Sequence, residues 1–147
     1  MFDREARDKT AEVLRHFISG QITNFKFENE MPSSDDPVIS AIADSMWVFY
    51  DDFTKHKMKG DWALPKETKE RVSRWIMFLH TDEEYKWPIF PYPGVRPLKH
   101  GWISHLLGKP LEEKMFVKFG AYSVWPFFDK ASYSNAKRHP RLLDGSL

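Results

Sequence analysis

Carboxylates are the side chains of this sequence whose positions most readily suggest chemistry. Asp51 and Asp52 stand together in the stretch YDDF, and Asp82, Glu83 and Glu84 form a second group. Two carboxylates can act as general acid and general base when their environments separate their pKa values. Adjacent helical residues point about 100° apart, so Asp51 and Asp52 cannot form such a pair by themselves. A pair between Asp51 and Asp82 or Glu84 stays open, and with it a small enzyme of unknown substrate.

The histidines do not reach a metal-ligand spacing. His100 and His105 are five residues apart, which on a helix separates their directions by about 140°. His80 and Glu84 share a helical face only if a helix continues through both. Cysteine is absent, which excludes a thiolate metal site, a thiol nucleophile and a disulfide framework. We therefore expect no metal and no cofactor.

Sequence motifs of nucleotide-binding proteins and hydrolases are missing as well. The seven glycines are scattered and form neither a P-loop nor a dinucleotide-binding G-x-G-x-x-G. The G-x-S-x-G and H-E-x-x-H patterns are also absent. Without a catalytic motif, we expect a binding function and no catalytic residues.

The stretch EYKWPIFPYPGVRP, residues 84–97, concentrates four prolines and four aromatic residues. Each proline disfavours the α conformation in the residue before it, so we expect a stiff, extended and ordered loop. Trp87, together with Trp125 further along the chain, is expected to cover a helical core. Tyr92 and Arg96 are expected to be exposed. A stiff loop that presents tyrosine and arginine is typical of a recognition hot spot, because little entropy is lost on binding.

Apolar periodicity predicts the elements that position these residues. We expect helices at 3–19, 37–53 and 65–80 and a short one from 129, with an extended run at 21–27. The segment 113–125 alternates weakly and fits either a strand or a helix. The predicted fold is a mainly α-helical single domain over residues 1–147, with long ordered proline- and aromatic-rich loops and at most a minor β element. Its predicted core consists of Val13, Phe17, Ile42, Met46, Val72, Ile76 and Leu79.

Charge is unevenly distributed along the chain. Residues 1–84 carry a net charge of −5 and residues 85–147 carry +6, which leaves the whole chain at +1. Such a dipolar surface can steer a charged partner. The basic residues are spread thinly, so we expect no direct nucleic-acid binding. No apolar run approaches the roughly 20 residues of a membrane span, and the N-terminal stretch lacks the apolar segment of a secretory signal, so we also expect no membrane attachment.

Three aromatic stretches carry a resemblance: MWVFYDDF, RWIMFLHTDEEYKWP and GAYSVWPFF. Together they resemble the small immunity proteins of bacterial toxin systems, including contact-dependent inhibition. The resemblance implies a cytoplasmic protein that binds one cognate toxin, often a nuclease, and neutralises it by blocking its active site. The acidic groups at 35–36, 51–52 and 82–84 would then imitate phosphates in a basic cleft.

The expected partner-binding residues are Asp51, Asp52, Asp82, Glu83, Glu84, Tyr92 and Arg96. A regulatory protein-binding module remains an alternative beside the small enzyme. The sequence does not predict an oligomeric state.

Overall fold

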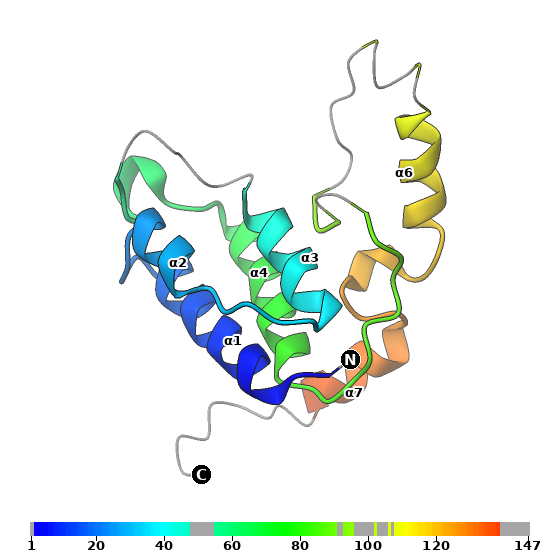
Figure 1. Ribbon diagram of the computed structural model, residues 1–147, viewed down its shortest axis with the longest axis horizontal. Coiled ribbons are helices and arrows are strands. Elements are labelled where there is room, and N and C mark those ends of the chain that lie inside the picture. The colour runs from blue at the N-terminus through cyan, green and yellow to red at the C-terminus, as the bar shows by residue number, and fades with distance from the viewer. Residues whose placement is uncertain are drawn as a thin grey trace.

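Helices dominate the computed structural model, which describes residues 2–47, 55–90, 93–95, 102, 106 and 108–138. In chain order they are α1 (Arg4–Ile18), α2 (Asn24–Glu30), α3 (Pro37–Met46), the 3-10 turn η2 (Gly60–Trp62), α4 (Lys66–Leu79), α6 (Lys109–Val117), the 3-10 turn η3 (Tyr122–Val124) and α7 (Lys130–Arg138) (Figure 1). Within these residues, β structure is limited to an isolated antiparallel bridge between Thr23 and Lys57. The predicted mainly α-helical fold is confirmed.

The ends of α1 and the start of α3 follow the capping residues of the sequence. Asp3 is the N-cap of α1, and its side chain accepts a hydrogen bond of 3.0 Å from the backbone N–H of Ala6. Gly20 follows the end of α1 with a φ of +76°, a conformation that glycine adopts without strain. Asp36 caps α3 in the same way, with Pro37 at the first helical position. Helix α1 is one residue shorter at each end than the predicted helix over 3–19, and α3 begins at Pro37 as predicted.

The expected extended run over residues 21–27 is wrong, because α2 begins within it. Thr23 caps this helix, and its Oγ1 accepts a hydrogen bond of 3.2 Å from the backbone N–H of Lys26. Phe27 then stacks on Phe17 of α1, with ring centroids 4.5 Å apart. The seven-residue helix is too short to be stable alone, so this tertiary contact favours it over the extended conformation.

Two other expected elements can be compared with the structure. Helix α3 runs from Pro37 to Met46 with Trp47 as its C-cap, and residues 48–53 of the predicted helix lie outside the described part of the chain. The open alternative at 113–125 resolves as helix, since α6 runs to Val117 and η3 follows. The last helix starts after Asp129, whose carboxylate accepts a hydrogen bond of 2.7 Å from the backbone N–H of Ser132, as expected.

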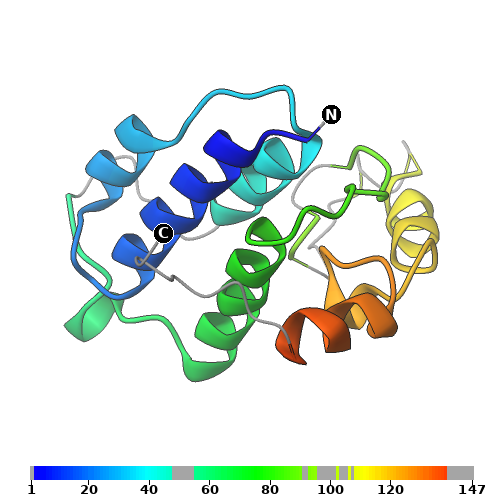
Figure 2. The same ribbon diagram turned by 90° about the horizontal axis from the view of Figure 1, so that it is seen from below.

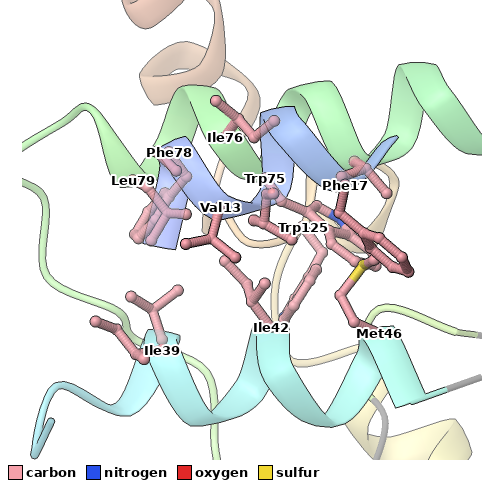
Figure 3. Close-up of a cluster of buried hydrophobic side chains, with 14 of the residues drawn as sticks. Val13, Phe17, Ile39, Ile42, Met46, Trp75, Ile76, Phe78, Leu79 and Trp125 are labelled. Carbon is pink, nitrogen blue, oxygen red and sulfur yellow. The ribbon is translucent and has the colours of Figure 1, made fainter. Parts of the chain in front are cut away.

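The hydrophobic core lies where α1, α3 and α4 meet (Figure 3). All seven predicted core residues are buried there. Trp87 and Trp125 are buried too, which confirms that they cover the helical core. Trp125 meets Trp75 of α4 edge to face, with ring centroids 5.4 Å apart, and Phe127 meets Phe78 at 5.1 Å. These aromatic pairs join the C-terminal segments to the helices of the N-terminal half.

A buried ion pair fixes the start of α3 against α1. Arg7 and Asp36 are both almost wholly inaccessible to solvent, and Arg7 Nε lies 2.6 Å from Asp36 Oδ2. Arg7 also donates to the carbonyl oxygens of Thr81 and Glu83, at 3.1 and 2.8 Å. The same guanidinium therefore ties the segment that follows α4 to the other two helices, with every bond charge-assisted.

Arg4 adds a second attachment one turn earlier on α1. Its guanidinium donates to the carbonyl oxygens of Leu79, at 2.8 Å, and of Thr81. These carbonyl groups lie at the C-terminal end of α4, where the helix dipole favours a positive charge.

No helix in the described ranges is long and apolar enough to cross a membrane.

Candidate functional site

The predicted partner-binding residues fall into two groups. Asp51, Asp52, Tyr92 and Arg96 lie outside the described residues. Asp82, Glu83 and Glu84 are described, and they directly follow the end of α4. Only this second acidic group can therefore be placed on the fold.

The three carboxylates after α4 have different surroundings. Asp82 forms an ion pair of 2.7 Å with Arg4, although its side chain is 68% exposed. Glu84 is exposed, whereas Glu83 is half-buried. Burial raises the pKa of the Glu83 carboxyl group, opposed by a hydrogen bond with Ser132. Asp82 and Glu84 thus offer accessible negative charge, and their contact with a partner stays a prediction.

The raised pKa of Glu83 predicts a pH-dependent effect of its substitution. The folded state holds the proton more tightly than the unfolded chain, so this group stabilises the fold below its ordinary pKa of 4.5. That contribution is lost as the pH rises through the raised value. Glu83→Gln removes the half-buried charge, and its gain in unfolding free energy over the unsubstituted protein should be larger at pH 7 than at pH 4.

Urea unfolding followed by circular dichroism at the two pH values measures this difference. Glu84→Gln, at the exposed neighbouring position, is the matched control and should show no such trend. An equal effect of Glu83→Gln at both pH values would contradict the assignment.

Asp36 was expected among the groups that imitate phosphates, and this expectation is wrong. Its carboxylate is fully buried and bound to Arg7, and it also caps α3. A carboxylate in this position stabilises the fold and cannot reach a partner.

Among the described residues, no three histidine or acidic side chains lie close enough together to hold a metal ion.

The outer side of α6 exposes large apolar side chains to solvent. Leu111 and Met115 are 63% and 65% exposed, and Phe119, just after the helix, is 54% exposed. Leu111 and Met115 are four residues apart, so they lie about 40° apart around the helix axis. Phe119 follows the end of α6, and its ring centroid lies 6.3 Å from that of Trp87 and 5.8 Å from that of Phe128. We call Leu111, Met115 and Phe119 the α6 apolar face.

The opposite side of α6 already has its packing partners. Phe116 is buried, and its ring centroid lies 5.1 Å from that of Trp87 and 5.1 Å from that of Phe90. Glu113 is buried on this inner side too. The inner contacts fix the orientation of the helix, and they turn Leu111 and Met115 towards solvent.

Positive charge flanks the α6 apolar face on one side. Lys114 and Lys118 are exposed, and their helical positions lie about 100° and 60° from that of Met115. Three more large apolar residues are exposed in the segments that precede the helix: Ile89, Trp102 and Leu106. In both Figures 1 and 2, α6 lies at the edge of the molecule, away from α1 and α2.

The sequence contained a signal for this face that the prediction did not use. Gly108 and Pro110 are typical of a helix start, and Leu111, Met115 and Phe119 repeat with a spacing of four. The prediction instead weighed the shorter alternation of Met115, Val117 and Phe119, which left strand and helix equally open.

Comparisons with known proteins return no match: no family model, no curated protein and no solved structure is significantly similar to this chain.

Proposed function

We propose that this chain is a protein-binding module that neutralises a partner by masking its surface, and that it docks through the α6 apolar face. The observation that carries the proposal is the exposure of Leu111 and Met115 on one side of α6 and of Phe119 just after the helix, while the other side of α6 is packed. Solvent-exposed apolar residues that cluster in this way are typical of protein interaction sites. Methionine and phenylalanine are also enriched in such interfaces.

The charges around the face define the chemistry of the partner. Lys114 and Lys118 flank the apolar residues, within a part of the chain that carries a net charge of +6. A complementary partner surface has an apolar centre and carboxylates at its rim. Complementary rim charges raise the association rate and reject partners of the wrong sign. Asp82 and Glu84 supply negative charge on a separate segment, for a basic part of the same partner.

The class of partner that we propose is a bacterial toxin domain. This part of the proposal is supported by the resemblance of the three aromatic stretches to small immunity proteins. An immunity protein blocks its toxin by forming a stoichiometric complex in the cytosol of the producing cell, and we propose the same site of action here. Masking of a surface requires no catalytic group on the inhibitor.

Co-expression and titration test this function together. The protein encoded by the gene directly upstream should inhibit growth when its C-terminal domain is produced alone, and co-expression of this chain should restore growth. In vitro, the toxin activity should fall linearly with added chain and reach its minimum at one equivalent.

Two results would reject the proposal. If the two proteins form no complex and co-expression gives no growth protection, the upstream-encoded protein is not the partner of this chain. Protection by far less than one equivalent of this chain would show turnover, and it would place the protein among the enzymes.

A further inference from the structure

A pocket of about 280 Å³ lies between α4 and the segment that carries η3. It shares no residue with the α6 apolar face. Its charged and hydroxyl-bearing lining consists of Glu67, Glu70, Arg71 and Arg74 from α4 and of Tyr122 and Ser123 from the opposite wall. A pocket of this size suits a small group rather than a drug-sized ligand.

One of the two arginines is held in a fixed orientation. Arg74 is partly buried, and its Nε donates a hydrogen bond of 2.8 Å to the carbonyl oxygen of Trp125. No described residue accepts a hydrogen bond from its two terminal nitrogens, which belong to a side chain that lines the pocket. Burial lowers the pKa of the Arg74 guanidinium; Tyr133 and Tyr122 oppose this shift, and the nearby charge of Arg71 adds to it.

The glutamates of the same helix form no ion pair with either arginine of the pocket. Glu67 and Glu70 stand four residues before Arg71 and Arg74, the spacing that favours an ion pair on a helix. Within the described ranges, neither pair comes within 4 Å, and Glu70 instead lies 3.9 Å from Lys66. Two guanidinium groups thus border the pocket without a carboxylate partner from the described part of the chain.

We infer that this pocket binds a carboxylate group through Arg71 and Arg74. The planar fork of a guanidinium matches the two oxygens of a carboxylate, and the hydroxyl group of Ser123 offers a further donor in the lining. The negative charges of Glu67 and Glu70 oppose a second negative charge on the ligand. A singly charged carboxylate is therefore favoured over a phosphate dianion. The carboxylate comes either from a small organic acid or from an acidic side chain of a peptide.

Nuclear magnetic resonance of the arginine Nε–Hε groups tests this site directly. Propionate and the blocked tripeptide acetyl-Ala-Glu-Ala-amide are the two singly charged carboxylate probes, and propionamide, inorganic phosphate and sodium chloride are compared with them at equal ionic strength. Saturable shifts of the Arg74 signal with propionate assign a small-acid site, and shifts with the tripeptide alone assign a peptide site. Shifts of equal size with chloride, or tighter binding of phosphate, would overturn the inference.

Arg71→Gln gives the matching test by substitution. Arg71 makes no hydrogen bond or ion pair with a described residue, so its loss should leave the fold intact. The affinity for the carboxylate probe should fall by about tenfold or more, as expected for the loss of a charge-assisted contact. Lys69→Gln removes the same charge from an exposed position of α4 and should leave the affinity unchanged. An unchanged affinity in Arg71→Gln, or an equal loss in both variants, would overturn the inference.

Discussion

Replacing Arg7 by methionine should lower the free energy of unfolding by about 3–5 kcal/mol, the cost typical of breaking a buried ion pair from one side. The substitution leaves the carboxylate of Asp36 buried without its counter-ion. It also removes the donor to the carbonyl oxygens of Thr81 and Glu83. Three segments of the chain lose a shared partner at once, so the effect should exceed that of any surface substitution.

Urea unfolding monitored by far-UV circular dichroism measures this loss. Lys9→Met, at a largely exposed position of the same helix, is the matched control and should change the stability by less than about 0.5 kcal/mol. Adding Asp36→Asn to Arg7→Met should recover part of the loss, because the uncompensated buried charge is then removed. A loss below about 1 kcal/mol in Arg7→Met would show that the ion pair does not hold the three segments together.

The sequence predicted those parts of the fold that depend on local interactions. Asp36 was identified as the N-cap of α3, because a capping carboxylate and the following Pro37 are neighbours in the chain. Its partner Arg7 is 29 residues away on another helix, and nothing in the local pattern links the two. The same residue was therefore predicted correctly in its local role and wrongly as a surface charge.

The packed side of helix α6 could not be predicted from its own sequence either. The helix carries apolar residues on both sides, since Phe116 is buried while Leu111 and Met115 are exposed. A pattern of this kind has no single apolar stripe, so it does not reveal which side packs against the protein. That choice is made by Trp87 and Phe90, which belong to a distant segment.

The pocket beside α4 could not be foreseen for a related reason. The spacing of Glu70 and Arg74 favours an ion pair within the helix, whereas the structure turns Arg74 towards the carbonyl oxygen of Trp125. That oxygen lies 51 residues further along the chain.

Of the predicted partner-binding residues, the acidic group at Asp82–Glu84 can be placed on the fold.

Replacing Met115 by glutamate should weaken the complex with the toxin domain by at least about 2 kcal/mol, or roughly thirtyfold in Kd. Met115 lies in the middle of the α6 apolar face, where the proposed interface excludes water. A carboxylate buried there would lose its hydration without gaining a partner. It would also meet the acidic rim that Lys114 and Lys118 are expected to contact. Because the side chain is 65% exposed in the free protein, the substitution should leave its folding unchanged.

Calorimetric titration of the toxin domain with this variant tests whether the α6 apolar face is the docking site. Ser40→Glu introduces the same charge at an exposed position of α3 and serves as the control. We expect Ser40→Glu to bind like the unsubstituted protein and Met115→Glu to lose at least about thirtyfold in affinity, with both variants retaining the thermal unfolding midpoint of the parent. Equal affinities for the parent protein, Met115→Glu and Ser40→Glu would contradict docking through the α6 apolar face, because the partner would then bind elsewhere on the molecule.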